Sequence, residues 1–254
     1  MCGLYGIIAK DGNIENELLL ALHNQATSWG HDAWGYIAGW KQGRNTDVEI
    51  DKGIGHIPNL IPELGYANFV LGHTRAATQG NPRNNDNNHP VVSSDKTTYV
   101  THNGMINEKR YYDYIRSKWD PDYVPYCEVD TLALPEMISG FVNDGADLTT
   151  AVSLLFNMME DQIRTDSAAI ATVHNSNNNK IVLAATSAPL NIWVYDNQIV
   201  YASVSRWIEG GIHHSGSYLK KIVPNEMISL RYGEIFSIDS DTLEYHIIRK
   251  QNDN

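Results

Sequence analysis

Continuous apolar runs separated by short polar breaks dominate the chain and predict a protein rich in strands. The first run, LYGIIA at residues 4–9, does not alternate with polar residues, which is typical of a strand buried on both faces. Residues 147–163 differ because their apolar side chains recur at helical spacing: Leu148, Val152, Leu155, Phe156, Met159 and Ile163. We therefore predict a buried strand at the start of the chain and an amphipathic helix beyond its middle.

The order of the expected elements indicates the fold class. A helical segment around residues 18–26 follows the first strand, and another helix is expected at residues 107–118. Further strands are expected at residues 34–40, 48–53, 68–74, 97–103, 167–174, 180–186, 192–196, 198–204, 226–233, 234–239 and 243–249. This order favours an α+β layered sandwich, in which two sheets pack face to face between helices. Because no repeat, linker or shift in composition divides the chain, we expect one domain over residues 1–254.

Composition excludes several classes of function. The formal net charge is -11 and no basic run occurs, so nucleic acid is not an expected partner, and no apolar stretch is long enough to cross a membrane. The two cysteines, Cys2 and Cys127, are too few for a disulfide framework and fit a reducing compartment, so we expect a cytoplasmic protein. No metal and no cofactor are expected, because the histidines lack ligand spacing and no phosphate-binding loop occurs.

The position of Cys2 raises a question about its role. Chance is one answer, and a lipid-modified secreted protein is set aside because only Met1 precedes the cysteine. A third answer is that removal of Met1 leaves Cys2 as the first residue. Its thiol and its free α-amine would then act together as nucleophile and base.

Three further segments place polar groups at the ends of expected strands. GHTR, ending at Arg75, opens a long polar loop that runs to Asp95 and that we expect to be open until a ligand closes it. THNG carries the Asn103-Gly104 pair, which alone would be read as an ordinary turn. In VDT, Asp130 alone would be read as a helix cap.

Together with Cys2, these segments form a consistent set for attack on a carboxamide. An Asn side-chain N–H beside a Gly backbone N–H offers two donors to a tetrahedral oxyanion, a role that suits Asn103 and Gly104. If the substrate is an amino acid, Arg75 suits its α-carboxylate and Asp130 its α-ammonium group. We therefore predict glutamine as the substrate.

The same motifs resemble those of the class II glutamine amidotransferases, N-terminal-nucleophile hydrolases that include the glutaminase domains of glucosamine-6-phosphate synthase and asparagine synthetase. The matches, in order along nearly the whole chain, are CGLYGI, GHTRAATQG, NHP, THNGMIN and the aspartate of VDT. The resemblance implies a four-layer αββα sandwich. It also implies that Cys2, Asn103 and Gly104 are catalytic and that Arg75, Thr78 and Asp130 line the glutamine pocket.

Some residues depart from the pattern of that family. Trp29 stands where an arginine is usual, Ala76 replaces a tryptophan associated with ammonia passage, and Leu132 stands near Asp130 where the sugar synthases often carry glutamate. The chain also ends where an acceptor or synthase domain would begin, so we expect a separate synthase subunit as a possible partner. The predicted function is hydrolysis of glutamine through a Cys2 thioester, giving glutamate and ammonia. The alternatives are an amidase for another γ-glutamyl or acyl amide and an idle regulatory partner of a synthase.

Overall fold

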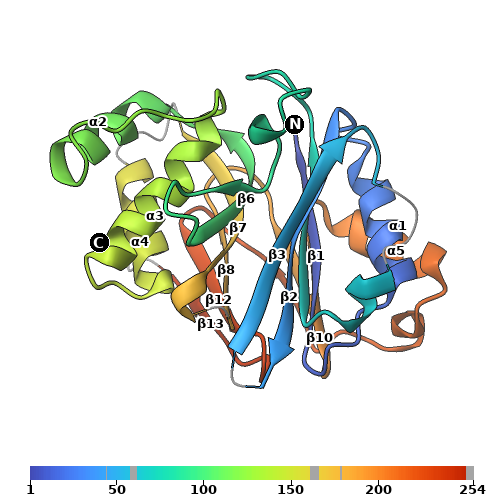
Figure 1. Ribbon diagram of the computed structural model, residues 1–254. Helices are drawn as coiled ribbons and strands as arrows, with labels where there is room; N and C mark the ends of the chain where they lie inside the picture. The colour runs from blue at the N-terminus through green and yellow to red at the C-terminus, as the bar shows by residue number, and fades with distance from the viewer. Residues whose placement is uncertain (44, 58–61, 161–165, 178, 250–254) are drawn as a thin grey trace.

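The computed structural model describes residues 1–43, 45–57, 62–160, 166–177 and 179–249. Two antiparallel sheets pack face to face, and helices cover the outer face of each (Figure 1). This four-layer arrangement confirms the α+β sandwich expected from the order of the apolar runs. None of the helices in the described ranges is long and apolar enough to cross a membrane.

Strand order differs from chain order in both sheets. Within the described residues, one sheet has seven strands in the order β11-β9-β10-β1-β4-β2-β3, and the other has six in the order β13-β12-β8-β7-β6-β5. The strands of the first sheet are β1 (Gly3–Ala9), β2 (Ala33–Gln42), β3 (Asn45–Ile54), β4 (Phe69–Arg75), β9 (Asn191–Val194), β10 (Gln198–Ala202) and β11 (Glu226–Ser229). Those of the second are β5 (Val91–Val92), β6 (Thr98–Met105), β7 (Ser167–His174), β8 (Lys180–Ala185), β12 (Glu234–Asp239) and β13 (Tyr245–Ile248).

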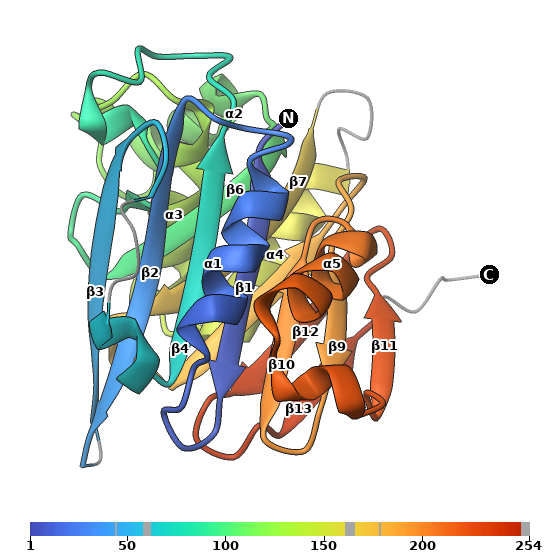
Figure 2. The ribbon, with the colours of Figure 1, turned by 90° about the vertical axis from the view of Figure 1, so that its right-hand side faces the viewer.

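Helices from the two ends of the chain cover the seven-stranded sheet. Figure 2 shows α1 (Asn16–Ala26) and α5 (Ser205–Ser215) lying over β1, β4 and β10. The six-stranded sheet is covered by α2 (Glu108–Lys118), α3 (Ala133–Asn143) and α4 (Leu148–Glu160). The helix predicted for residues 147–163 is thus confirmed as α4, and residues 161–163 lie outside the described part of the chain.

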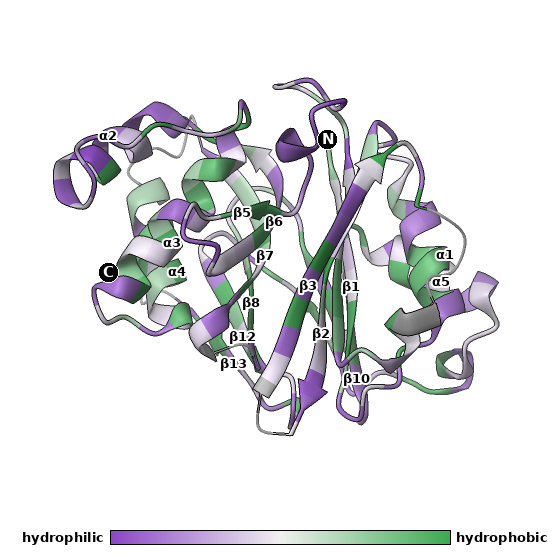
Figure 3. Ribbon diagram, in the orientation of Figure 1, coloured by the Kyte–Doolittle hydropathy of each residue, from purple (hydrophilic) through white to green (hydrophobic). Residues whose placement is uncertain are grey.

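Apolar side chains fill three layers between these elements. In β1, Leu4 and Ile8 point into the core between the sheets, whereas Tyr5 and Ile7 pack beneath α1 and α5. A third cluster lies between the six-stranded sheet and its helices. Figure 3 shows the apolar colouring concentrated on the inner strands and on the helix faces that meet them. Because both faces of the central strands are buried, their sequences are continuously apolar.

Helix α5 was not among the expected elements. Its sequence contains two glycines, Gly210 and Gly211, which weaken any helical signal. The second glycine has a packing role, because a Cβ at Gly211 would lie 2.9 Å from a methyl carbon of Leu22 in α1. The close approach of α1 and α5 therefore explains why a glycine occupies position 211, although glycine weakens the helical signal in the sequence.

Three chain segments meet at one rim of the sandwich. β1 begins at Gly3 opposite Thr74 near the end of β4, and β6 of the other sheet carries Asn103 to the same place. Figure 1 shows the N-terminus at this rim, between the two sheets. Rigid sheets thus bring the chain start, residue 75 and residue 103 together although they are far apart in sequence.

Candidate active site

Cys2 sits at the start of β1, between the two sheets. Its backbone nitrogen donates a hydrogen bond to Asn103 Oδ1 at 3.1 Å, and its Sγ donates to the Ala76 carbonyl oxygen at 3.7 Å. The preceding residue, Met1, is 71% exposed. The cysteine is therefore held from both sheets at the rim, while the residue before it projects toward solvent.

Burial raises the pKa of the Cys2 thiol, although the Ala76 carbonyl and the positive charges of the chain terminus and Arg75 act in the opposite direction. A thiol with a raised pKa stays protonated near neutral pH. Nucleophilic attack then requires a nearby proton acceptor.

Asn103 and Gly104 lie inside β6, so the reading of this pair as an ordinary turn is wrong. Asn103 is buried, and because its side-chain oxygen faces the Cys2 nitrogen, its amide NH₂ group is available to another acceptor. Gly104 has φ 149°, and a Cβ there would lie 1.9 Å from the Ser167 carbonyl oxygen in β7. Glycine is thus required where β6 and β7 pair beside Cys2.

Arg75, the last residue of β4, is buried beneath the polar loop that follows it. Its Nη1 donates to Asn88 Oδ1 at 2.8 Å, and its Nη2 donates to the carbonyl oxygens of Gly80, at 3.0 Å, and Gln79. The loop was expected to be open because it has little apolar surface. In the structure it is closed, because hydrogen bonds to the guanidinium group replace apolar packing.

The loop is also tied to the segment that carries Asp130. Asn87 is fully buried; its Nδ2 donates to Glu128 Oε2 at 2.8 Å and its Oδ1 accepts from the Glu128 backbone nitrogen at 2.9 Å. These reciprocal bonds fix the spacing between the two segments. Sequence reasoning missed this contact because the partners are 41 residues apart.

Asp130 does not cap a helix, so that reading of it is wrong. Its Oδ2 accepts a hydrogen bond from the Ile106 backbone nitrogen at 2.9 Å, just beyond the end of β6. Its own backbone nitrogen donates to Gln79 Oε1 at 3.3 Å. Asp130 therefore connects the strand that carries the Asn103-Gly104 pair with the loop that covers Arg75.

Three buried histidines support this rim. His73 Nε2 lies 3.0 Å from the His102 carbonyl oxygen and 2.7 Å from His89 Nδ1, while His102 Nδ1 lies 2.9 Å from Thr131 Oγ1. Burial lowers the pKa of each imidazole, and that of His73 falls to about 3. His89 and His102 are therefore neutral imidazoles bonded within the protein, and both also line the cavity beside Cys2.

One small cavity collects most of the predicted site residues. Cys2, Arg75, Thr78, Gly104 and Asp130 all line it, and Asn103 contacts Cys2 from β6. Its volume is about 20 Å³, room for roughly one water molecule. In the described ranges no three His, Cys, Asp or Glu side chains cluster closely enough to hold a metal ion. The sequence-predicted residues therefore meet, in a closed site that must widen to admit an amino acid.

The residues that depart from the expected family pattern have clear structural surroundings. Trp29 packs edge-on against Trp207 with ring centroids 4.8 Å apart and does not line the cavity. Leu132 and Cys127 are buried in a small apolar cluster, whereas Ala76 lines the cavity. Trp29 therefore belongs to the packing of the turn after α1 against α5 and not to the wall around Cys2.

Comparisons with known proteins place this site in context. No protein-family model matches the chain. It is 28% identical over 204 residues to a glutamine–fructose-6-phosphate aminotransferase of Bacillus thuringiensis subsp. konkukian, covering 80% of the chain and 32% of that protein. It is 26% identical over 243 residues to a Staphylococcus aureus protein of the same name, covering 95% of the chain and 38% of the relative. The chain thus spans about a third of the length of these curated relatives.

The solved structures show a shared fold. The glutamine phosphoribosylpyrophosphate amidotransferase from B. subtilis matches with a TM-score of 0.68 at 18% identity, covering 96% of this chain and 49% of that one. An allosteric regulatory enzyme of purine biosynthesis matches with a TM-score of 0.67 at 19% identity, covering 96% of this chain and 48% of that one. These matches confirm the four-layer sandwich of two antiparallel sheets between helices that the sequence motifs implied.

Proposed function

We propose that this chain hydrolyses the side-chain amide of glutamine, with Cys2 as nucleophile. The relatives confirm its resemblance to the class II glutamine amidotransferases and support an enzyme of that class. The observation that carries the proposal is the meeting of Cys2, Asn103, Arg75 and Asp130 around one cavity. These groups offer a nucleophile, an oxyanion donor, a cation for the α-carboxylate and an anion for the α-ammonium group.

The first half-reaction begins once the residue before Cys2 has been removed. The freed α-amine takes the thiol proton, and the sulfur attacks the amide carbon of glutamine. The amide oxygen becomes an oxyanion that accepts hydrogen bonds from the Asn103 side chain and the Gly104 backbone. Because Asn103 Oδ1 already accepts from the Cys2 nitrogen, it orients the amine that moves the proton. Transfer of that proton to the leaving nitrogen releases ammonia and leaves a γ-glutamyl thioester.

In the second half-reaction, water replaces ammonia. The α-amine accepts a proton from a water molecule while the water oxygen attacks the thioester carbon. The tetrahedral intermediate then collapses and expels the Cys2 sulfur, which takes the proton back from the amine. Glutamate then leaves. The raised pKa of the thiol fits this scheme, because attack depends on the amine rather than on a pre-formed thiolate.

We further propose that residues 1–254 act as one glutaminase unit without a cofactor, and that ammonia passes to an acceptor on a separate synthase. The two relatives named above are aminotransferases of fructose 6-phosphate that extend well beyond the matched segment. Ala76 lines the cavity at the position where the resemblance implies a tryptophan associated with ammonia passage, so we do not expect a passage of that design in this chain. The cytoplasmic location stays a prediction.

The test combines intact mass, product analysis and one substitution. We expect active protein to lack Met1 and to release ammonia and glutamate in equal amounts from glutamine. Cys2→Ala should abolish turnover while leaving the urea unfolding curve nearly unchanged, because the loss of one sulfur atom just before β1 leaves both sheets and their apolar cores intact. Full activity of protein that retains Met1, or of Cys2→Ala, would refute the mechanism. Release of ammonia from other amides but not from glutamine would favour the alternative amidase, and no release from any amide would favour a regulatory partner.

A further inference from the structure

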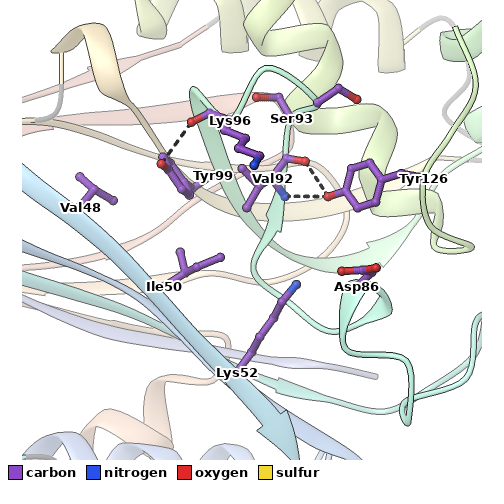
Figure 4. Close-up of a pocket in the computed structure, with 10 residues that line it drawn as sticks. Val48, Ile50, Lys52, Asp86, Val92, Ser93, Lys96, Tyr99 and Tyr126 are labelled. Carbon is purple, nitrogen blue, oxygen red and sulfur yellow. Dashed lines mark hydrogen bonds between the residues drawn. The ribbon is translucent and has the colours of Figure 1, made fainter.

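A second, larger cavity opens between the edges of the two sheets. Its volume is about 660 Å³, within the range typical of small-molecule sites. Edge strand β3 supplies Val48, Ile50 and Lys52 on one side, and β5 and β6 supply Val92 and Tyr99 on the other (Figure 4). We call this cavity the edge groove. Its floor is apolar and aromatic, and it is far larger than the cavity beside Cys2.

The charged groups of the edge groove are two ammonium groups and one carboxylate. Lys52 and Lys96 line it together with Asp86, which lies below Tyr126 in Figure 4. The neighbouring hydroxyl groups are already engaged, because Ser93 Oγ donates to Asp95 at 2.6 Å and Ser94 Oγ donates to Glu136. The lysines are therefore the strongest donors left for a ligand.

We propose that the edge groove binds a small organic anion with an apolar or aromatic body. The anionic group would lie between Lys52 and Lys96, and the body would lie against Val48, Ile50 and the Tyr99 ring. Asp86 would accept a hydrogen bond from a ligand hydroxyl or amino group. The two ammonium groups outnumber the single carboxylate, Asp86, which is why the charge pattern of the edge groove favours an anion.

Lys52 connects the edge groove with the glutamine site. Its Nζ donates to the carbonyl oxygens of Asn88 at 2.8 Å and Pro90 at 2.9 Å, which leaves one of its three N–H donors for a ligand. The Asn88 side chain in turn accepts from Arg75. Burial lowers the pKa of Lys52 to about 8, and a bound anion would favour its charged form. Through this chain of contacts a bound ligand would regulate the affinity for glutamine, an inference that rests on the proposed function.

Binding can be measured without any catalytic readout. The probe is 8-anilinonaphthalene-1-sulfonate, an aromatic anion, with neutral N-phenyl-1-naphthylamine as its counterpart. Lys96→Asn removes one charge and suits the left-handed backbone at this position, where φ is 60°. Val48→Trp fills the groove, and Lys221→Asn, at an exposed lysine outside it, is the matched control. Urea unfolding and light scattering accompany each variant.

We expect the anionic probe to bind the unaltered protein with one site, roughly tenfold more weakly in Lys96→Asn, and not at all in folded Val48→Trp. The neutral probe should bind more weakly and respond little to Lys96→Asn. The proposal would be overturned if the anionic probe bound all variants with equal affinity, or if the anionic and neutral probes bound the unaltered protein equally well. Probe binding that depends on self-association of the protein would overturn it too. KM for glutamine should change when the probe is bound. An unchanged KM refutes the coupling alone, whereas absent glutaminase activity refutes the proposed function and leaves the binding result standing.

Discussion

Asn103 offers a test that separates two roles of one side chain. Its oxygen holds the Cys2 nitrogen at 3.1 Å, and its NH₂ group is the proposed donor to the oxyanion. Asn103→Ala removes both contacts. Asn103→Asp keeps an oxygen acceptor for the Cys2 nitrogen but lacks the donor and places negative charge where the oxyanion forms. The pair of variants therefore distinguishes anchoring of the nucleophile from stabilisation of the transition state.

The expected magnitude follows from these contacts. Loss of one oxyanion donor typically lowers kcat by about 100- to 1000-fold, or ~2.7–4 kcal/mol. Loss of a neutral hydrogen bond to the Cys2 nitrogen contributes about 0.5–1.5 kcal/mol more. Asn103→Ala should thus lower kcat by at least about 100-fold with a smaller change in KM. Asn103→Asp should be no more active than Asn103→Ala.

Steady-state kinetics with coupled glutamate detection measures both constants, and urea unfolding checks that each variant is folded. Near-normal kcat in Asn103→Asp would mean that anchoring of Cys2 is the important role. A rise in KM alone in Asn103→Ala would refute the oxyanion assignment.

Three further predictions concern stability, binding and pH. Gly104→Ala should lower the free energy of unfolding by roughly 1–3 kcal/mol, seen in urea titrations, because its Cβ would lie 1.9 Å from a β7 carbonyl oxygen. Arg75→Lys and Asp130→Asn should each raise KM for glutamine about 10- to 100-fold in initial-rate assays, with kcat less affected. Burial lowers the pKa of His23 to about 4 and that of His73 to about 3, so below about pH 6.5 the unfolded chain binds protons that the folded protein does not. Stability should therefore fall as pH drops from about 6.5 toward 4, by up to about 1.4 kcal/mol per pH unit for each such histidine, and unfolding curves at pH 7, 6 and 5 should show it.

The strands and the meeting of the motifs could be predicted from the sequence. β1 and the first part of β4, Phe69–Leu71, are continuously apolar because both of their faces are buried, so these strands can be located from the sequence alone. The polar residues that follow or precede such strands then fall at one rim of a rigid sheet. That reasoning brought Cys2, Arg75 and Asn103 together, as the structure does.

The contacts of the polar loop could not be predicted in this way. Asparagine-rich segments signal turns or disorder by composition, but Asn87 and Asn88 are fully buried. Their amides bond to Glu128 and Arg75, and these partners are specified by the fold rather than by local spacing. Lys52 is a similar case, because an alternating edge strand gives no sign that its lysine reaches across to the loop carbonyl oxygens.

The same contacts carry a consequence for substrate entry. The Arg75 guanidinium that should hold the glutamine carboxylate is occupied by three acceptors of the loop, and the cavity beneath has room for roughly one water molecule. Glutamine must therefore exchange its carboxylate for some of those acceptors, and the loop must move as it enters. Because the loop is also held by Glu128 and Lys52, its movement involves both the Asp130 segment and β3. We therefore expect that binding of the carboxylate, placement of the α-ammonium group and occupancy of the edge groove are linked through the loop. The link runs through the side chains of Asn87 and Asn88 and the backbone carbonyl oxygens of Asn88 and Pro90.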